Sequence, residues 1–376
     1  MITVLHVSRD EKFFDWAFNA LKNYTSYSNK ALIITDREDY VLKYVKESEG
    51  VEFAWNKELI KECFQTGNYD IVYFHSLPFS LYDEIKYIPK NKILIWWGWG
   101  YDLYIDEGGL PPLIKKKLIK PLTWSYLLSS RLNVKFLMRY FVWLLKRPTS
   151  IKKRNEVLKR IDYFQPIVKM EYELMKKNRY FRAKEFYSKT INGLFGPTDP
   201  KDKNGNILLG NSATSWNNHL DVLNIVLAAK QKEQKIIIPL NYGNMKYKKW
   251  LLPKIKSSDV IILNDFMPPK EYFDIVNSCS YAVFGMIRQQ AMGNINYALS
   301  KGIKVFLYEN SVIYQNHKEL GYAVYAIDEI NKDSFSSSLT PQEIEQNIIA
   351  SKREYERRID IYNKCIEDIE TILNKQ

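Results

Sequence analysis

The feature that most constrains the fold is the alternation of short apolar runs with helical patterns along both halves of the chain. In the first half the apolar runs are Ile2–His6, Ala31–Thr35, Ile71–Phe74 and Lys92–Trp96. In the second half they are Ile207–Leu209, Lys235–Pro239, Val260–Leu263, Tyr281–Phe284 and Lys304–Leu307. Strands that alternate with helices predict parallel sheets with helices on both faces. Two such series predict an α/β protein with two doubly wound, Rossmann-like domains that face each other across a cleft.

The length of 376 residues supports this division, because one core rarely serves more than about 250–300 residues. Loop-forming pairs gather between Gly193 and Gly205, where we expect the domain boundary. The predicted N-terminal domain covers residues 1–195 and the C-terminal domain covers 206–340. An amphipathic pattern after Pro341 predicts a long helix over 341–376, which we expect to pack back across the domain junction.

The chain shows neither of the sequence features that direct a protein into or across a membrane. It begins with the strand-like run Ile2–Leu5 instead of a signal peptide, and no apolar run reaches the roughly 20 residues that span a bilayer. We therefore expect a cytoplasmic protein whose membrane contact is peripheral. Its scattered cysteines have no metal-binding spacing, and we expect reduced thiols at Cys63, Cys279 and Cys365.

Positive charge is concentrated between Leu113 and Arg160, which hold fourteen Lys or Arg residues and one acid, Glu156. This stretch accounts for the whole net charge of +12, and aromatic and aliphatic residues interleave with its cations. A solvated helix face or a nucleic-acid contact would also use such a pattern, but no nucleic-acid-binding motif accompanies it. We favour an anionic membrane surface and expect no nucleic-acid partner, with nucleic-acid binding as a third alternative. The residues expected to meet the membrane are Lys115, Lys116, Lys117, Lys120, Trp124, Arg131, Lys135, Arg139 and Trp143.

Small polar residues follow the first strand of the second series, where ligands of open parallel sheets bind. Asn211, Ser212 and Thr214 can donate hydrogen bonds there, and the start of the next helix favours a phosphate. An ordinary helix N-cap is the alternative. After Tyr281–Phe284, Arg288 can hold a diphosphate or sugar hydroxyls, unless it is simply a surface arginine.

Further strand ends of the second series add aromatic and amide groups. Tyr242 can stack on a base or a sugar, and Phe266 and Met267 follow Val260–Leu263. The amides of Gln289 and Gln290 adjoin Arg288. A nucleoside-diphosphate sugar explains the set, because aromatic rings suit the base, a cation suits the phosphates and amides suit the sugar.

The first series ends its strands in aromatic and titratable groups. Trp97, Trp99 and Tyr101 lie in a glycine-containing loop that can approach a flat ligand, with buried core packing as the alternative. Asp102 is the preferred general base towards an acceptor hydroxyl, and His75 is the second candidate unless it is a structural histidine. His6 and Arg9 end the first strand and are expected to contact the acceptor. No DxD-type pair follows a strand, so we expect neither an essential metal nor another cofactor.

Several short motifs follow one another in a fixed order along the chain. They are Trp97–Tyr104, Leu209–Ser212, Asn218-His219, Asp265–Pro268, Glu271-Tyr272, Arg288–Gln290 and Gly293-Asn294. Their order resembles a known bacterial family, the 4-acetamido-4,6-dideoxygalactose (Fuc4NAc) transferases, or 4-alpha-L-fucosyltransferases, of enterobacterial common antigen synthesis. The similarity extends from about Ile2 to Ile327 and is greatest between Ile207 and Leu307.

The resemblance implies a GT-B glycosyltransferase with a dTDP-sugar donor in its C-terminal domain. It also implies a polyprenyl-diphosphate-linked saccharide as acceptor, at the inner face of the cytoplasmic membrane. At the matching positions Asn211, Ser212, Arg288, Gln289 and Gln290 would hold the donor, and we also expect His219 and Asn294 at the donor. Trp97, Trp99 and Asp102 would face the acceptor. A UDP- or GDP-sugar donor and a non-catalytic, membrane-associated carbohydrate-binding scaffold are the alternatives.

Overall fold

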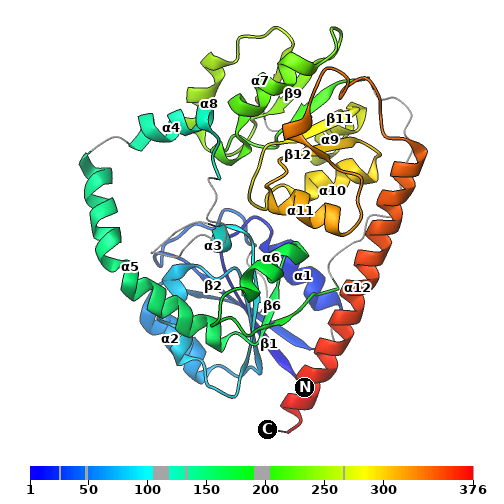
Figure 1. The fold of residues 1–376 in the computed structure, drawn as a ribbon. Coiled ribbons are helices and arrows are strands. Elements are labelled where there is room, and N and C mark those ends of the chain that lie inside the picture. Colours follow the sequence, from blue (N-terminus) through cyan, green and yellow to red (C-terminus); the bar gives the residue numbers. More distant parts are fainter. Residues whose placement is uncertain are drawn as a thin grey trace. The chain divides into compact units, whose positions relative to one another are not determined.

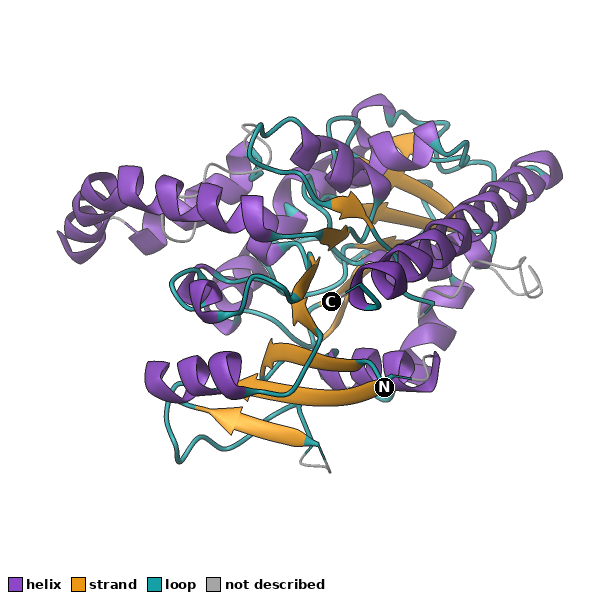
Figure 2. Ribbon diagram, turned by 90° about the horizontal axis from the view of Figure 1, so that it is seen from below, coloured by secondary structure: helices purple, strands orange, loops and turns teal. Residues whose placement is uncertain are grey.

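The computed structural model describes residues 1–24, 27–46, 50–104, 118–131, 134–189, 204–265 and 267–375. The chain forms two compact units, each built around a parallel sheet with flanking helices (Figures 1 and 2). The first unit comprises Met1–Lys115, Tyr140–Asn192 and Tyr355–Gln376. The second comprises Lys116–Arg139 and Gly193–Glu354. Each unit therefore combines segments that are distant in sequence.

The sheet of the first unit has the strand order β3-β2-β1-β4-β5-β6-β7 over the described residues, and every pairing is parallel. Its strands are β1 (Thr3–Arg9), β2 (Ser28–Ile34), β3 (Val51–Ala54), β4 (Ile71–His75), β5 (Ile93–Trp97), β6 (Tyr163–Gln165) and β7 (Lys184–Glu185). The helices are α1 (Phe14–Tyr24), α2 (Lys57–Thr66), α3 (Tyr101–Tyr104), α6 (Lys169–Lys176) and most of α5 (Val134–Arg160).

Both faces of this sheet are apolar, as expected for parallel strands buried between helices. Ile71 and Tyr73 of β4 pack in one core with Ala17 and Leu21 of α1. On the other face the ring of Phe74 meets that of Phe64 from α2, with centroids 6.4 Å apart. Successive residues of one strand thus serve opposite helical layers.

The sheet of the second unit has the order β10-β9-β8-β11-β12-β13 in the described part of the chain, again with parallel pairings. Its strands are β8 (Ile207–Leu209), β9 (Ile236–Pro239), β10 (Val260–Leu263), β11 (Tyr281–Phe284), β12 (Lys304–Leu307) and β13 (Tyr325–Ala326). The helices are α4 (Pro121–Arg131), α7 (His219–Ala229), α8 (Met245–Leu251), α9 (Pro269–Ser278), α10 (Met292–Ser300) and α11 (Val312–Glu319).

Alternate residues of the second sheet also divide between two cores. Ile207 and Leu209 pack with residues of α7 and α8 on one face. Leu208, between them, packs with residues of α9, α10 and α11 on the other face. The predicted α/β class with two doubly wound sheets is therefore confirmed.

The long C-terminal helix α12 (Pro341–Leu373) contributes to both units. In the second unit Ala350 joins the core beneath α10, and Asn347 accepts a hydrogen bond from the backbone of Ala323 at 2.7 Å. In the first unit Tyr362, Cys365 and Ile369 complete the core beside β4 and β5. The predicted helix thus exists, and its two parts belong to different cores.

Several short strands were not predicted from the sequence. They are β3, β6, β7 and β13, of which β7 and β13 have only two residues each. The basic stretch is also divided, because residues 116–139 group with the second unit and 140–160 with the first. The sequence pattern predicts one N-terminal domain over residues 1–195 that includes the whole basic stretch.

Candidate active site

The strand order of each sheet reverses at one point, where ligands of doubly wound folds bind beyond the carboxyl ends of the strands. In the first unit this point lies between β1 and β4. In the second unit it lies between β8 and β11. The strands at the two switch points lead into several of the residues singled out in the sequence, among them His75, Asn211 and Arg288.

Asp102 holds the loop that follows β5 in the first unit. Its carboxylate accepts hydrogen bonds from the backbone N–H groups of Leu77 and Trp99, each at 2.9 Å, and from Trp96 Nε1 at 2.8 Å. Burial raises the pKa of Asp102, while these N–H donors oppose the rise. The predicted general base is thus a buried carboxylate whose oxygens already bind three donors, an arrangement that fits a loop-holding role.

Three aromatic rings form a compact triangle at this switch point. The ring centroids of His75, Trp97 and Trp99 lie 5.6–5.9 Å apart in each pairing. Each ring has one buried nitrogen with no hydrogen-bond partner among the described residues: His75 Nδ1, Trp97 Nε1 and Trp99 Nε1. Buried polar atoms are rarely left without partners in native proteins, and a bound water or ligand is one explanation.

His6 is tied into the sheet. Its Nε2 lies 2.9 Å from Asn29 Oδ1, and its Nδ1 lies 2.9 Å from His75 Nε2. Burial lowers the pKa of His6 to about 4, although the bond to Asn29 opposes this. The structure leaves His6 no free ring nitrogen for an acceptor sugar.

Sequence reasoning overlooked Glu11, which lies two residues beyond the end of β1. The Tyr101 hydroxyl donates to Glu11 Oε1 at 3.2 Å and also bonds Ser76 Oγ, beyond the end of β4. Burial raises the pKa of Glu11, against the effects of Tyr101 and Arg9. Its place just after Arg9 at a strand end was the signal that could have identified it. Arg9 itself pairs with Asp36 at 3.6 Å and donates to Ser80 Oγ at 3.1 Å.

The turn after β8 in the second unit is organised by Asn217. Its Oδ1 accepts from the backbone N–H of Asn211 at 3.1 Å, and its Nδ2 donates to Thr214 Oγ1 at 2.9 Å. Gly210 adopts a positive φ of 72°, and a Cβ there would lie 2.9 Å from Asn217 Oδ1. Glycine is therefore required where this turn leaves the strand.

Asn218, the next residue, ties this turn to two other segments of the unit. Its backbone is left-handed, with φ of 50°, which asparagine tolerates better than most residues. Its Nδ2 donates to the carbonyl of Gly285 at 2.7 Å, and its Oδ1 accepts from the backbone N–H of Lys120 at 2.7 Å. The buried side-chain amide of Asn218 thus binds both the loop after β11 and the backbone at Lys120, within the basic stretch.

Asn211, Thr214, Tyr242 and Gln290 form one polar cluster at the β8–β11 switch point. Asn211 Nδ2 donates to the Tyr242 hydroxyl at 3.0 Å. Gln290 Nε2 lies 3.3 Å from Asn211 Oδ1 and 3.2 Å from Thr214 Oγ1. Ser212 joins through its hydroxyl, which donates to Asn211 Oδ1 at 3.3 Å.

Arg288 is held beside this cluster. Its Nη2 donates to Gln290 Oε1 at 3.0 Å, and its guanidinium lies 5.3 Å from the centroid of the Trp216 ring. Arg288 is half-buried, so its charge is partly screened from water. The second switch point therefore combines a positioned cation with hydroxyl and amide groups.

The remaining predicted donor residues are placed differently. His219 is fully buried, and its Nδ1 lies 3.0 Å from the Tyr247 hydroxyl. Burial lowers the pKa of His219 to about 3. Gln289 is buried and accepts from Arg288 through its carbonyl, whereas Met267 and Asn294 are half-buried and no hydrogen bond of the described cluster involves them. Phe266 lies outside the described residues.

The predicted membrane residues are only partly described. Lys115, Lys116 and Lys117 lie outside the described residues, as do the side chains of Arg131, Lys135, Arg139 and Trp143 within α4 and α5. Lys120 Nζ lies 3.9 Å from the centroid of the Tyr308 ring, and Trp124 is exposed. Exposed apolar side chains of the two helices are Leu122, Met138, Val142 and Leu145. No helix among the described residues is long and apolar enough to cross a bilayer.

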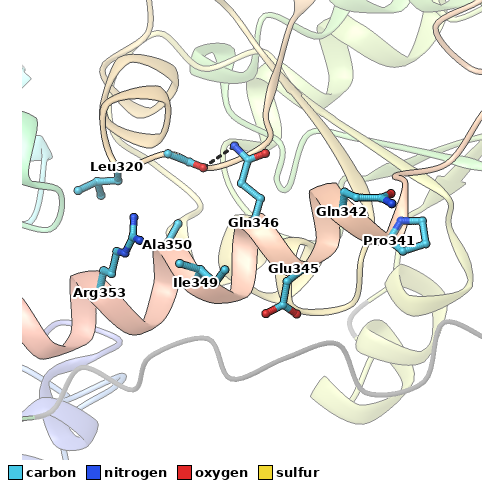
Figure 3. Close-up of a pocket in the computed structure, with 9 residues that line it drawn as sticks. Leu320, Pro341, Gln342, Glu345, Gln346, Ile349, Ala350 and Arg353 are labelled. Carbon is cyan, nitrogen blue, oxygen red and sulfur yellow. Dashed lines mark hydrogen bonds between the residues drawn. The ribbon is translucent and has the colours of Figure 1, made fainter.

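A shallow pocket of about 570 Å³ lies elsewhere in the second unit, between the end of α11 and the start of α12 (Figure 3). There Gln346 Nε2 donates to the carbonyl of Gly321 at 2.6 Å. None of the predicted site residues lines this pocket. Over the described part of the chain, no group of three or more His, Cys, Asp or Glu side chains is placed to hold a metal ion.

Two parallel, doubly wound sheets give this chain the GT-B fold, and its family match places it in the class of glycosyltransferases. Residues 135–351 match the family described as 4-alpha-L-fucosyltransferase, glycosyl transferase group 56. The chain belongs to this family, as the resemblance in its sequence had indicated.

Solved glycosyltransferase structures share the fold at low sequence identity. A glycosyltransferase from Rickettsia africae is 12% identical, with a TM-score of 0.55 over 100% of this chain and 99% of that chain. The UDP-forming alpha,alpha-trehalose-phosphate synthase of Burkholderia xenovorans is 8% identical, with a TM-score of 0.59 over 98% of this chain and 100% of that chain. The sucrose-phosphate synthase of Thermosynechococcus elongatus is 8% identical, with a TM-score of 0.56 over 100% and 98%.

Proposed function

We propose that this glycosyltransferase moves a Fuc4NAc-like deoxy-amino sugar from a dTDP-sugar to a polyprenyl-diphosphate-linked saccharide during synthesis of a bacterial surface polysaccharide. The family and its resemblance to Fuc4NAc transferases support this donor and this acceptor. The observation that carries the proposal is the cluster of Arg288, Gln290, Asn211 and Thr214 at the β8–β11 switch point.

The second unit would bind the donor through this cluster. Arg288 offers the positive charge that a departing nucleoside diphosphate needs, without requiring a metal. The turn from Asn211 to Asn218 leads directly into α7, whose N-terminal end favours an anion. The ring of Tyr242, whose hydroxyl is held by Asn211, is exposed and would stack on a base or sugar. The UDP-forming trehalose-phosphate synthase with this fold makes a nucleotide-linked donor reasonable here.

The first unit would bind the acceptor at the β1–β4 switch point. Trp97 Nε1 and Trp99 Nε1 are hydrogen-bond donors and His75 Nδ1 can be an acceptor, a combination that suits the hydroxyl groups of a sugar. Of the two predicted base candidates, His75 has such an unpartnered atom and Asp102 has its oxygens occupied. Glu11 is a third proton acceptor at the same edge, next to Tyr101.

The lipid-linked acceptor requires that the enzyme reach a membrane surface. Met138, Val142 and Leu145 lie on one side of α5 at steps of four and three residues, and all three are exposed. Leu122 and Trp124 are exposed on α4. Exposed apolar groups within a strongly basic stretch fit a peripheral contact with anionic lipids.

A thermal-shift series with dTDP, UDP and GDP tests the donor assignment. A ligand that binds the folded state at 100 times its Kd adds about 2.7 kcal/mol to stability, which raises Tm by a few degrees in a chain of this size. We expect dTDP to give the largest rise, and Arg288→Ala to reduce it. Arg37→Ala, at an exposed arginine of the first unit, is the matched control. Stabilisation by UDP or GDP but not by dTDP would remove this donor.

A transfer assay tests turnover itself. We expect sugar from dTDP-Fuc4NAc to appear on a polyprenyl-diphosphate-linked saccharide in detergent or in vesicles. Intact nucleotide binding with no transfer to any lipid-linked acceptor would instead support a binding scaffold.

A further inference from the structure

Buried side chains of three adjacent strands form a continuous chain of hydrogen bonds in the first unit. Asn29 Nδ2, at the start of β2, donates to the backbone carbonyl of Tyr27 at 2.8 Å. Asn29 Oδ1 lies 2.9 Å from Nε2 of His6 on β1. His6 Nδ1 lies 2.9 Å from Nε2 of His75 on β4. The chain ends at His75 Nδ1, which has no partner among the described residues.

The donors and acceptors in this chain follow from its first bond. A backbone carbonyl can only accept, so the Asn29 amide must turn its NH₂ towards Tyr27 and its oxygen towards His6. An amide oxygen also only accepts, so His6 Nε2 carries a proton. In a neutral imidazole the other nitrogen is then an acceptor, and His75 Nε2 must donate to it. His75 Nδ1 is consequently the unprotonated nitrogen.

The surroundings of the two rings favour this neutral state. His6 packs against Phe18 and Tyr73, and His75 packs against Phe14, Tyr73, Trp97 and Trp99. In these ring contacts of the described residues, the titratable groups that face the pair are the two histidines themselves and Tyr73, whose hydroxyl donates to Gln165 Oε1 at 2.6 Å. Burial lowers the pKa of His75 far below its usual range, and the neighbouring His6 lowers it further.

We propose that Asn29 and His6 are positioning residues that hold His75 in its Nε2-protonated tautomer, so that Nδ1 presents its lone pair to a hydroxyl of the acceptor saccharide. This inference rests on the proposed function of the first unit as the acceptor side. A hydroxyl that donates to Nδ1 has its oxygen oriented and its lone pairs left available for attack on the donor sugar. In the opposite tautomer an N–H at the same place would compete for those lone pairs.

Asn29 is the residue on which the arrangement depends. It is half-buried and is not at the carboxyl edge of the sheet, so it acts through His6 and not by touching substrate. Leucine at position 29 would remove the acceptor that holds the His6 proton on Nε2. Aspartate would keep an acceptor but would favour a second proton on His6, because a nearby carboxylate stabilises an imidazolium. A doubly protonated His6 donates from Nδ1 and forces the proton of His75 onto its own Nδ1.

Nitrogen-15 NMR of histidine-labelled full-length protein tests the tautomer without any substrate. The chain has only four histidines, so single substitutions assign their signals. His317 is an internal reference of the opposite kind, because its Nδ1 donates to the carbonyl of Ile313 at 2.8 Å. We expect His6 and His75 to show protonated Nε2 and unprotonated Nδ1 throughout pH 6–8. A protonated His75 Nδ1 in the unmodified protein would overturn the proposal.

Kinetics of the two position-29 variants connect the tautomer with catalysis. We expect Asn29→Leu to mix the His75 tautomers and to lower kcat about tenfold, with KM for the donor unchanged, as when the orientation of one catalytic contact is lost. We expect the kcat of Asn29→Asp to be near that of wild type at pH 8. As the pH is lowered, we expect the variant to lose activity earlier, that is at a higher pH, than wild type. Asn331→Leu, at an exposed site of the second unit, is the control.

The outcomes separate this proposal from the proposed function. Unchanged His75 signals and unchanged kcat in Asn29→Leu would contradict the positioning role while leaving the transferase assignment intact. The predicted tautomer in a protein that transfers no sugar to any acceptor would instead contradict the function, and the hydroxyl-binding role with it. The proposal also fails if a saturating concentration of the saccharide acceptor leaves the NMR signals of His75 unchanged, because Nδ1 then does not contact the acceptor.

Discussion

The two switch points differ in whether their polar side-chain atoms have hydrogen-bond partners. At the β8–β11 switch point the amides and hydroxyls bond one another, so the cluster of Asn211, Thr214, Tyr242 and Gln290 is largely self-satisfied. At the β1–β4 switch point each of three aromatic rings keeps a buried nitrogen that has no partner among the described residues, and in the second unit His219 Nε2, beside Gly210, is also such an atom. A self-satisfied polar cluster holds its shape without a ligand, whereas unpartnered nitrogens gain most when a ligand arrives. We therefore expect the second unit to bind its nucleotide with little rearrangement.

Removing the charge of the second switch point should have the largest effect. We expect Arg288→Ala to lower kcat by about 10²- to 10³-fold, by analogy with the loss of one preorganised group that stabilises developing charge. Arg288→Lys should recover part of the loss, because it keeps the charge but not the planar contacts to Gln290 and Trp216. Steady-state kinetics of both variants beside Arg37→Ala provide the test. Near-normal turnover of the alanine variant would take Arg288 out of the mechanism.

Breaking the rigid turn of the second unit should cost stability locally. Asn218→Ala leaves the backbone N–H of Lys120 and the carbonyl of Gly285 without their partner, at about 1–3 kcal/mol for each buried group. Alanine also tolerates the left-handed backbone poorly. We expect faster hydrogen exchange in residues 118–126 and at the start of α7, corresponding to a decrease of about 3 kcal/mol in the free energy of local opening. Asn218→Gly removes the same side-chain hydrogen bonds without the backbone strain, so it separates the two contributions. Exchange rates equal to those of wild type in both variants would contradict the role of Asn218 in holding this turn.

The buried histidines of both units predict a loss of stability in mild acid. The pKa of His6 falls to about 4 and that of His219 to about 3, whereas an unfolded histidine titrates near 6.5. Below pH 6.5 the unfolded chain binds protons that the folded chain does not, so each such group costs up to about 1.4 kcal/mol per pH unit.

Glu171 opposes this loss in the first unit alone. Burial raises its pKa to about 7 from 4.5, so between these values the folded state holds a proton that the unfolded state has released. Stability from Glu171 therefore increases as pH falls through this window. Thermal unfolding between pH 7.5 and 5 should show a steeper acid loss for Glu171→Gln than for wild type. Parallel curves would show that the Glu171 carboxyl is ionised in the folded protein.

Membrane binding can tell which unit makes the contact. We expect Leu122→Ser with Trp124→Ser on α4, and Val142→Ser with Leu145→Ser on α5, each to weaken cosedimentation with anionic vesicles. Replacing Lys115, Lys116 and Lys117 by Glu should release the protein, at about 1 kcal/mol for each cation. Ile349→Ser and Ile372→Ser, at exposed sites of α12, are the matched controls. Equal binding of all these proteins would contradict the membrane assignment.

The sequence predicted those strands whose apolar runs are long enough to mark a buried core. Ile207–Leu209, Val260–Leu263, Tyr281–Phe284 and Lys304–Leu307 match the observed strands at both ends. β7 and β13 were not predicted because two residues show no periodicity. They form strands because each pairs with the strand beside it in the sheet, β7 with β6 and β13 with β12. Tertiary pairing, and not local pattern, creates such strands.

The sequence pointed to candidate site residues where a polar or charged group follows a strand end, as for Asn211, Arg288 and His75. A residue's role was not predictable where its side chain works through a partner remote in sequence. Asn29 meets His6 only because β1 and β2 pair in a register that sets Val4 opposite Asn29. Asn217 and Asn218 similarly look like ordinary loop residues in the sequence. Their structural role could not be predicted, because their hydrogen bonds exist only in the folded turn.

The division of α12 between two cores has a consequence for biosynthesis. Tyr362, Cys365 and Ile369 complete the core of the first unit, and Asp368 binds both Tyr163 and Lys184 there. Although domains generally form in the order of translation, the sheet that begins at Thr3 lacks part of its apolar cover until Tyr362, Cys365 and Ile369 have left the ribosome. Any truncation or stalled nascent chain that stops before Tyr355 therefore leaves the earliest-made strands exposed to chaperones and proteases.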